Sequence, residues 1–167
     1  RLRVSVDVHG VEVQSHHIPE WKHFLYEEVW KVKPVRISRM DPAMKSTDTD
    51  AQTLAREEAQ REGFGEVLLL SKDGRITEGG ITNVWFVEGD QLVTPGRDIL
   101  PGIARGLVLK AAEDLEIEVV ERDVMERDVM EAELECFDAV FLTNSIRGMV
   151  ATGSIHPLMQ KVADWCT

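Results

Sequence analysis

The fold is decided by the stretch Glu66-Val67-Leu68-Leu69-Leu70-Ser71-Lys72-Asp73-Gly74-Arg75-Ile76-Thr77. A short apolar run, an Asp-Gly pair and a second apolar segment predict a strand, a tight turn and a returning strand. The same pattern follows at once, with apolar runs at 83–87 and 91–94 joined through Glu88-Gly89-Asp90. Two successive hairpins therefore form the predicted beginning of a sheet.

Helical patterns flank these hairpins. The first predicted helix runs over about 50–62, is capped by Asp48 or Thr49 and stops at Gly63. The second opens at Leu100-Pro101-Gly102-Ile103 and reaches about residue 115. Their predicted inward faces are Ala51, Leu54, Ala55 and Ala59 in the first, and Leu107, Val108, Ala111 and Ala112 in the second. A strand at 117–120, a helix around 126–136 and a strand at 138–143 complete a mixed α/β pattern.

The N-terminal part is less regular. Residues 1–13 alternate apolar and polar, which predicts one half-buried strand. Residues 14–34 are compatible with a helix around 20–31 or with an ordered crossing loop. Their aromatic residues Trp21, Tyr26 and Trp30 could mark an adaptor surface, but core packing explains such a cluster better.

A tandem pentapeptide interrupts the second half of the chain. Glu121-Arg122-Asp123-Val124-Met125 is repeated identically as residues 126–130. We interpret it as a local duplication in which one copy is surplus to the fold, and as the start of a solvated helix. The repeat is too short to indicate a repeat architecture.

Composition excludes several classes of protein. The 167 residues include 30 acidic and 19 basic side chains, so the formal charge is −11, which disfavours binding to nucleic acid or to an anionic membrane. The two cysteines have no neighbours at metal-ligand spacing, which argues against a zinc site and a disulfide framework. We expect no metal, no membrane span and a location in the cytoplasm.

Four segments are candidates for chemistry. They are Lys45-Ser46-Thr47-Asp48, residues 77–83 (TEGGITN), residues 100–105 (LPGIAR) and residues 142–148 (LTNSIRG). Three of them lie at predicted strand or helix ends, where sites are usually built. Gly102, Ile103 and Ala104 would present free backbone N–H groups at a helix N-terminus, which suits a phosphate.

In this order and spacing the segments resemble the fold-type IV pyridoxal-phosphate enzymes. This family includes branched-chain aminotransferases, D-amino-acid aminotransferases and 4-amino-4-deoxychorismate lyases. The resemblance runs from about Lys45 to Arg147 and combines the lysine, the Glu-Gly after an Asp-Gly turn, the Leu-Pro-Gly-Ile-x-Arg block and a hydroxyl-bearing loop. It implies a mixed, partly barrel-like sheet with flanking helices, namely the large C-terminal domain of such an enzyme.

The resemblance also implies roles for single residues. Lys45 would form the Schiff base with the aldehyde of pyridoxal 5′-phosphate and then move a proton. Glu78 would face the pyridine nitrogen and keep it protonated. The phosphate would be held by the amides of Gly102, Ile103 and Ala104 and by the hydroxyl of Ser145. Arg147 is the candidate for a substrate carboxylate, with a plain surface role equally open, and we expect Asn83 and Arg105 to brace the loops.

Some features depart from the family pattern. Ala104 stands where many relatives have threonine, and the duplicated pentapeptide lengthens the segment before Ser145. The family's smaller N-terminal lobe is mostly absent, so we expect 1–44 to be its remnant together with a crossing segment, and 45–167 to be the cofactor-binding domain. The chain is expected to be a fragment.

Three functions remain open at this point. The favoured one is a lyase that releases pyruvate and 4-aminobenzoate from a chorismate-derived substrate, because residues 143–148 resemble the Asn-Ser loops of those lyases. The alternative within the family is a branched-chain or D-amino-acid aminotransferase with a small amino-acid-like substrate. The alternative of another class is a truncated domain without catalysis. The resemblance also implies a homodimer.

Overall fold

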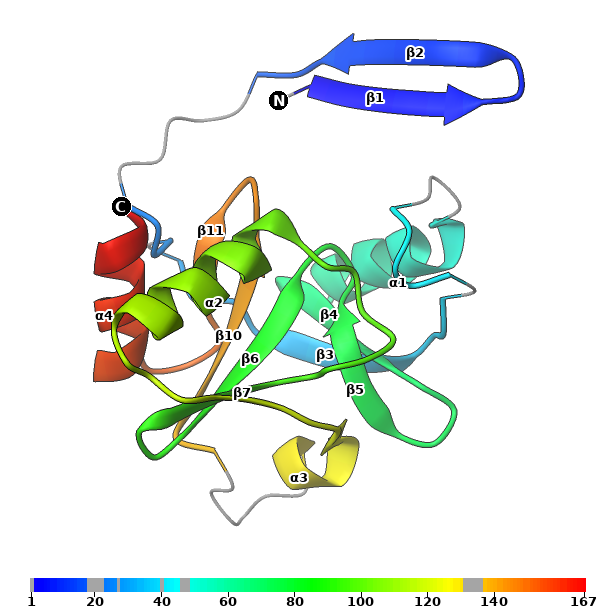
Figure 1. Ribbon diagram of the computed structural model, residues 1–167. Helices are drawn as coiled ribbons and strands as arrows, with labels where there is room; N and C mark the ends of the chain where they lie inside the picture. The colour runs from blue at the N-terminus through cyan, green and yellow to red at the C-terminus, as the bar shows by residue number, and fades with distance from the viewer. Residues whose placement is uncertain (1, 18–22, 27, 40, 46–48, 131–136) are drawn as a thin grey trace.

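The computed structural model describes residues 2–17, 23–26, 28–39, 41–45, 49–130 and 137–167 (Figure 1). The strands are β1 (Leu2–Asp7), β2 (Gly10–Ser15), β3 (Val32–Arg36), β4 (Glu66–Leu70), β5 (Arg75–Gly79), β6 (Asn83–Glu88), β7 (Gln91–Thr94), β8 (Val119–Glu121), β9 (Val124–Met125), β10 (Ala139–Asn144) and β11 (Gly148–Ala151). The helices are α1 (Asp50–Arg61), α2 (Ile103–Asp114), α3 (Glu126–Met130) and α4 (Pro157–Cys166).

Two sheets form the body of the molecule. One has five strands in the order β11-β10-β6-β7-β8, and the other has four in the order β3-β4-β5-β9. Most neighbours pair antiparallel, but β3 pairs parallel with β4 and β7 pairs parallel with β8. The predicted mixed α/β class is confirmed.

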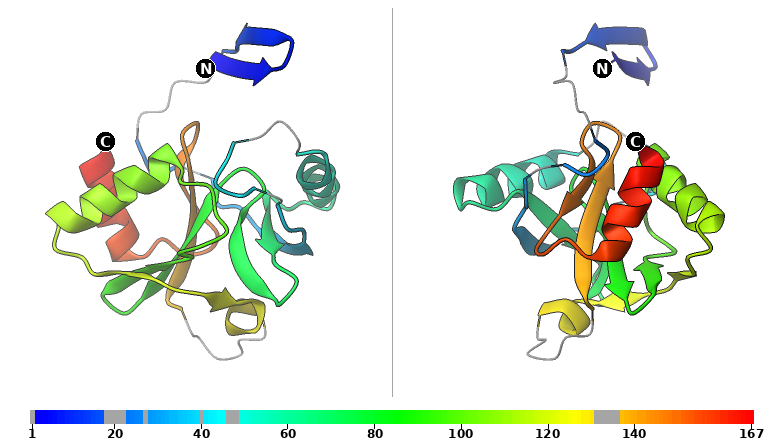
Figure 2. Two further views of the ribbon diagram at one scale, coloured as in Figure 1. Left: turned by 45° about the vertical axis from the view of Figure 1, so that its right-hand side comes forward. Right: turned by 90° about the vertical axis from the view of Figure 1, so that its left-hand side faces the viewer.

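Helices cover the outer faces of the two sheets (Figure 2). α2 and α4 pack on the five-stranded sheet, where the core includes Trp85, Val108, Phe141 and Met159. Between the sheets lies a second core, which contains Leu68, Ile76, Phe86, Leu142 and others. α1 covers β4 from outside through Ala59 and two apolar strand residues. Adjacent residues of β6 thus point into different cores, as the two-residue period of a strand requires.

The two hairpins that dominate the sequence pattern are confirmed. β4 returns through Asp73-Gly74 into β5, and Gly74 has φ +81°. β6 returns through Gly89 into β7, with Phe86 opposite Val93. All five residues of β4 are buried, because α1 covers one face of this strand and the second core covers the other.

The predicted single strand over residues 1–13 is wrong. Asp7 Oδ1 accepts hydrogen bonds from the N–H groups of His9 and Gly10, so the chain turns and β1 pairs with β2. The prediction of half-burial is also wrong, because the valines of this hairpin are exposed, and the hairpin stands apart from the body (Figure 1). They are Val4, Val6, Val8, Val11 and Val13.

Both long helices are confirmed, but their buried faces differ in part from the predicted ones. In α1, Leu54 is 65% exposed, and the buried residues are Gln52 and Ala59. In this orientation Arg56 reaches the buried Glu66. In α2, Val108, Ala111 and Ala112 are buried as predicted, whereas Leu107 is 42% exposed and Ala104 is buried in addition. Thr49 occupies the N-cap of α1 without a side-chain hydrogen bond, and Asp48 lies outside the described residues.

The duplicated pentapeptide takes two different conformations. The first copy ends β8 and forms β9, where Val124 is fully buried opposite Ile76 of β5. The second copy forms α3, with Asp128 accepting a hydrogen bond from the N–H of Met125. The interpretation of a solvated helix start is therefore wrong for the first copy. The predicted helix over 126–136 is described only as α3, since 131–136 lie outside the described residues.

Beyond β2 and β9, the elements β3, β11 and α4 were not predicted. β3 begins within the irregular stretch 14–34, and its described neighbours at 23–26 and 28–31 are not helical, while Trp21 lies outside the described residues. β11 and α4 follow the last predicted strand. None of the helices in the described part of the chain is both long and apolar enough to cross a membrane.

Candidate active site

Glu78 is the buried carboxylate of the site. It lies on β5 and is 4% exposed. Its Oε1 accepts a hydrogen bond from Arg39 Nη1 at 2.7 Å, and its Oε2 accepts one from the N–H of Leu100 at 2.9 Å. Burial raises the pKa of Glu78, while the N–H of Leu100, the Arg39 guanidinium and the nearby Lys45 ammonium act to lower it.

Lys45 is exposed and follows a turn at 41–44. The N–H of Met44 bonds to the carbonyl of Asp41 at 3.3 Å, and the carbonyl of Met44 accepts from Arg39 Nη2 at 2.5 Å. Arg39 bonds both to Glu78 and to the carbonyl of Met44, the residue directly before Lys45. The structure therefore brings the predicted lysine and the predicted carboxylate together.

The loop before α2 is held at Leu100 from two sides. Glu78 accepts from its N–H, and Asn83 Nδ2 donates to its carbonyl at 2.8 Å. Asn83 thus braces this loop as expected. A Cβ on Gly102 would lie 2.3 Å from Asn83 Oδ1, so no larger residue fits at this position without moving the loop.

The start of α2, where the sequence predicts a phosphate site, differs from the prediction at Gly102. Gly102 is the N-cap, but its N–H already bonds to the carbonyl of Leu100 at 2.8 Å and is not free. Ile103 and Ala104 begin the helix, and first-turn N–H groups have no acceptor within a helix. Ile103 is exposed, so a ligand can approach this end.

Ser145 lies in the turn between β10 and β11. Asn144 Oδ1 accepts from the N–H groups of Ile146 and Arg147, which fixes the turn and leaves Ser145 exposed. Gly148 has φ +68°, and a Cβ there would lie 2.3 Å from the carbonyl oxygen of Phe24. Thr143, two residues before Ser145, is paired with Asn83, so the turn lies at the same end of the sheet as the Leu100 loop.

Arg147 rests on two aromatic rings. Its guanidinium carbon lies 4.8 Å from the ring centre of Tyr26 and 5.7 Å from that of Trp30, and Nη1 donates to the Tyr26 hydroxyl. Trp30 is buried in the core between the sheets, as core packing predicted, whereas Tyr26 is partly exposed. The cation is therefore held in place by cation–π contacts.

A buried carboxylate fixes the turn that follows Glu78. Glu66 is fully buried and accepts from Arg56 Nε at 3.1 Å and from the N–H of Val67 at 3.0 Å. Its other oxygen accepts from the N–H of Ile81 and the hydroxyl of Thr82. Burial raises its pKa more than these contacts lower it. Glu66 thereby links α1, β4 and the 79–82 turn.

Arg105 has a structural place behind the site. It is 8% exposed, its guanidinium lies 5.7 Å from the ring centre of Trp85, and Nη2 is 3.0 Å from Glu121 Oε1. This contact ties α2 to the first copy of the pentapeptide, which agrees with a bracing role.

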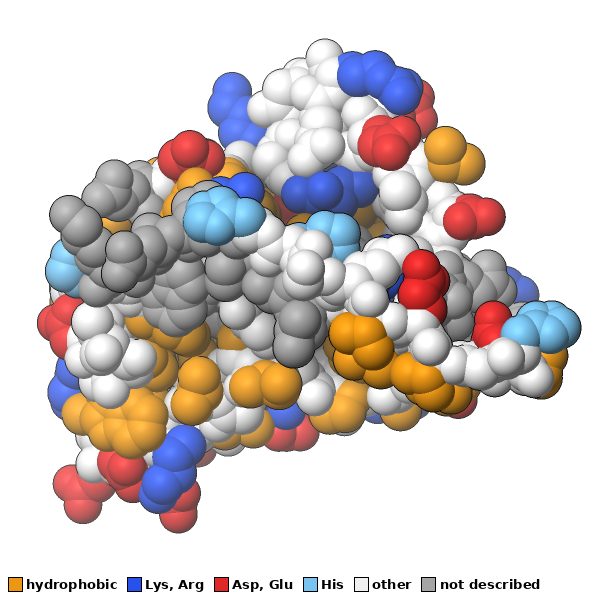
Figure 3. All heavy atoms as spheres, turned by 90° about the horizontal axis from the view of Figure 1, so that it is seen from above, with side chains coloured by type: hydrophobic (Ala, Val, Ile, Leu, Met, Phe, Trp, Pro, Cys, Tyr) orange, Lys and Arg blue, Asp and Glu red, His pale blue; other side chains and the backbone are white. Residues whose placement is uncertain are grey.

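The start of α2, the β10–β11 turn and the loop leading to α1 share the upper side of the molecule (Figure 1). Seen from above, basic side chains on this side are scattered (Figure 3). An anionic ligand would therefore depend on local groups and not on a broad basic surface.

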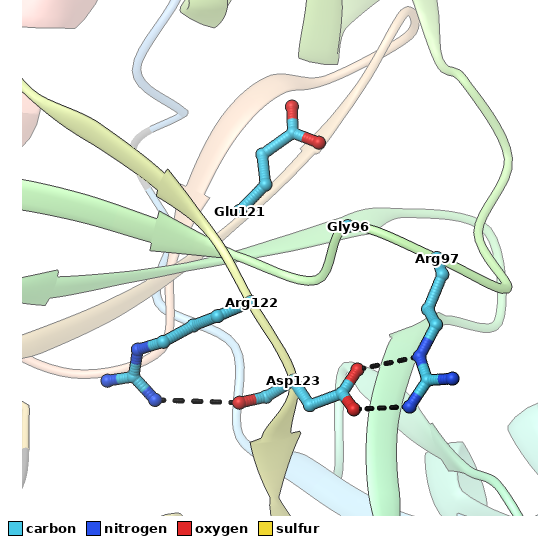
Figure 4. A pocket seen from close by; sticks show the side chains of 5 residues that line it. All are labelled: Gly96, Arg97, Glu121, Arg122 and Asp123. Atoms are coloured by element: carbon cyan, nitrogen blue, oxygen red, sulfur yellow. Dashed lines mark hydrogen bonds and ion pairs between the residues drawn. The ribbon is translucent and has the colours of Figure 1, made fainter.

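A hollow elsewhere does not belong to the site. It has a volume of about 330 Å³ and is lined by Gly96, Arg97, Glu121, Arg122 and Asp123 (Figure 4). Arg97 pairs with Asp123 in a two-bond contact, and Arg122 turns toward Glu88. These charges satisfy one another, and none of the predicted site residues lines the hollow.

Comparison with known proteins defines the class. Residues 11–155 match the profile of the family described as amino-transferase class IV. The chain therefore belongs to the class IV aminotransferases, whose members depend on pyridoxal phosphate.

Among relatives by sequence, a provisionally named branched-chain-amino-acid aminotransferase of Thermotoga maritima is 35% identical over 136 residues, covering 80% of this chain and 47% of the relative. The chain thus spans about half the length of that relative.

Solved structures agree on the fold. The branched-chain aminotransferase of Thermoproteus uzoniensis with norvaline superposes with a TM-score of 0.79 at 24% identity, covering 97% of this chain and 58% of that one. A provisionally named 4-amino-4-deoxychorismate lyase from Legionella pneumophila gives 0.73 at 22%, covering 91% and 57%. The second structure shows that the fold alone does not separate the two reactions.

Sequence reasoning missed Arg39, Tyr26, Leu100 and Glu66. Arg39 is one of five basic residues between 31 and 45, and Leu100 acts through its backbone. Only the tertiary contacts distinguish them. For Glu66 a signal existed, since a charged residue at the start of an otherwise apolar strand is unusual.

Proposed function

We propose that this chain is the cofactor-binding part of a pyridoxal-phosphate-dependent enzyme that acts on the amino group of a small amino-acid-like substrate. The observation that supports it most directly is that Arg39 links a buried carboxylate, Glu78, to the chain directly before an exposed amine, Lys45, while the same carboxylate accepts from the N–H of Leu100 in the loop before α2. Family membership supports the same chemistry.

The residues present fit this cofactor. A carboxylate has about four acceptor sites, and two donors use only part of them at Glu78. The amine of Lys45 is accessible, as are Ile103 and Ser145. An aldehyde, a ring nitrogen and a phosphate would thus each meet a suitable group.

Each residue has a part in the proposed reaction. When bound, pyridoxal phosphate supplies an electron-withdrawing ring that stabilises negative charge at the substrate's α carbon. Lys45 Nζ would hold the cofactor covalently until the amino group of the substrate takes its place, and the freed amine would then move a proton at that carbon. Glu78 keeps the ring nitrogen protonated. The N–H groups of Ile103 and Ala104 and the hydroxyl of Ser145 bind the phosphate, and Gly102 shapes the approach to them.

Arg147 is the proposed partner of a substrate carboxylate. Its guanidinium is oriented by Tyr26 and Trp30 while donors remain on its other nitrogens. An oriented guanidinium binds a carboxylate with less loss of side-chain entropy than a free one.

Two reactions are supported by different observations. An aminotransferase is favoured by the relatives in Thermotoga maritima and Synechocystis, which are provisionally named for branched-chain amino acids. A lyase that releases pyruvate and 4-aminobenzoate is favoured by the Asn144-capped turn and by Ala104, which lacks the hydroxyl of many aminotransferases. The relatives support the transferase at least as well as the turn supports the lyase.

We also propose that the protein forms a homodimer, which the family resemblance supports, and that it is located in the cytoplasm, which the low cysteine content supports. The division into 1–44 and 45–167 is likewise a proposal. It rests on the family resemblance, and within 1–44 the crossing segment already joins the body before Lys45, because β3, at 32–36, pairs with β4.

The test of the class is chemical labelling of Lys45. Protein mixed with pyridoxal phosphate is reduced with borohydride, digested and mapped by mass spectrometry. We expect the label on Lys45 and its loss in Lys45→Ala, with Lys72→Ala as the control. Label on Lys72 or Lys110 would refute the assignment.

The reaction is tested with separate substrates. The enzyme is given aminodeoxychorismate alone, or leucine or D-alanine with 2-oxoglutarate. Glutamate formation supports the transferase. Pyruvate and 4-aminobenzoate from the first substrate support the lyase.

A further inference from the structure

We infer that Arg39 is a positioning residue of the candidate active site. Its single guanidinium fixes the Glu78 carboxylate and the chain just before Lys45 relative to each other. That this positioning serves cofactor binding rests on the proposed function, whereas the positioning of Glu78 and of the chain before Lys45 can be tested without any cofactor.

The contacts of Arg39 join two distant parts of the chain. Nη1 is 2.7 Å from Glu78 Oε1 on β5, and Nη2 is 2.5 Å from the carbonyl oxygen of Met44. The two side chains of the ion pair are 14% and 6% exposed, so solvent screens the pair little. A guanidinium is planar and its donors have fixed directions, so two bonds from two nitrogens hold both partners at a set geometry.

The two partners are otherwise unequally constrained. Glu78 belongs to a buried strand and is also held by Leu100. Met44 and Lys45 lie outside any helix or strand and are exposed. Arg39 therefore anchors the loop that carries Lys45 to the rigid strand β5. Its positive charge also favours the ionised form of Glu78.

The first experiment titrates Glu78 in cofactor-free protein. Glutamate carboxyl groups are labelled with ¹³C, the Glu78 signal is assigned with Glu78→Gln, and the pKa is measured in wild type, Arg39→Gln and Arg36→Gln. Arg36 is the matched control, because it lies three residues earlier and pairs with Glu126 at the surface. We expect Arg39→Gln to raise the pKa of Glu78 by about one unit or more, and Arg36→Gln to leave it unchanged.

The second measurement is amide hydrogen exchange at Lys45. Arg39→Gln should speed exchange there about tenfold, as expected for a loop that loses its anchor, without a comparable change in β6. Arg39→Lys should preserve the Glu78 pKa, because the charge remains, but should still speed exchange, because an ammonium cannot bridge both partners. This variant keeps the inference testable if Arg39→Gln fails to fold.

An unchanged Glu78 pKa in Arg39→Gln, or unchanged exchange at Lys45 in either variant, would overturn the inference. Cofactor binding gives a third readout: Arg39→Gln should weaken it about tenfold, since a preorganised site binds more tightly. Tighter binding would instead mean that Arg39 competes with the cofactor for Glu78, which contradicts a positioning role. Failure of wild type to bind would refute the proposed function but leave the first two measurements valid.

Discussion

Glu78 and Glu66 show how one residue type acquires two roles through its surroundings. Both are buried, and in both burial raises the pKa. The carboxylate oxygens of Glu66 accept hydrogen bonds from Arg56 and from the 79–82 turn, whereas Glu78 lies beside an exposed lysine. The first is suited to holding a loop and the second to meeting a ligand.

Glu78→Gln should retain cofactor binding but lower kcat/KM by 10²–10³-fold. The loss of one preorganised electrostatic group costs about 3 kcal/mol of transition-state stabilisation. Steady-state kinetics on the full-length enzyme, with circular dichroism as the control for folding, measures the effect. Full activity in this variant would remove Glu78 from the reaction.

Glu66 makes the stability depend on pH in a definite direction. Its pKa is raised in the folded protein, so the folded state holds the proton over a range where the unfolded state has lost it. The free energy of unfolding must therefore fall as the pH rises from about 4.5 through the folded pKa. We subtract the free energy of unfolding of Glu66→Gln from that of wild type, both measured by urea unfolding from pH 4 to 7. This difference should decrease as the pH rises. An increase would mean that the Arg56 pair outweighs burial.

At the scale of elements, the pentapeptide shows that local sequence does not set conformation. The first copy pairs with the edge of β5 and becomes β9, while the second pairs with no strand in the described part of the chain and forms α3. The N–H of Glu126 bonds to the carbonyl of Gly74, which places the boundary between them. Tertiary contacts override a local preference that is identical in both copies.

Val124→Ala and Val129→Ala form a matched pair within this repeat. Val124 is fully buried, so its truncation should cost about 1.5–3 kcal/mol, the value of burying a valine side chain. Val129 only partly packs on the same core and should cost less than half as much. Thermal or urea unfolding of the two variants checks this. Equal costs would contradict the assignment of strand and helix to the two copies.

At the scale of the molecule, stability is unevenly distributed. The body has a core on each side of the five-stranded sheet, with Trp85 and Phe86 pointing to opposite faces. The β1–β2 hairpin has neither, since its cross-strand pairs Val4–Val13 and Val6–Val11 are exposed. A two-stranded hairpin alone is marginally stable in water.

Hydrogen exchange should therefore separate the hairpin from the body. Amides of β1 and β2 should exchange through local opening, at least about a thousandfold faster than those of β6, which require global unfolding. Mass spectrometry of peptides from 2–15 and 83–88 measures both in one sample. Equal protection would show that the hairpin is covered in solution.

The roles of the candidate site residues, which rest on short ordered motifs, stay a prediction. The sequence alone determined the two hairpins and the long helices, because each depends on a local signal: a glycine-containing turn or a 3.6-residue period. It failed for Leu54 and Leu107, whose exposure depends on how each helix rotates to meet its sheet. The prediction of a free N–H at Gly102 was also wrong, because this N–H donates a hydrogen bond to the carbonyl of Leu100. The contacts of Arg39, the contact of Tyr26 with Arg147 and the two forms of the pentapeptide became apparent only with the tertiary structure, since the partners lie far away in the chain and no local pattern records them.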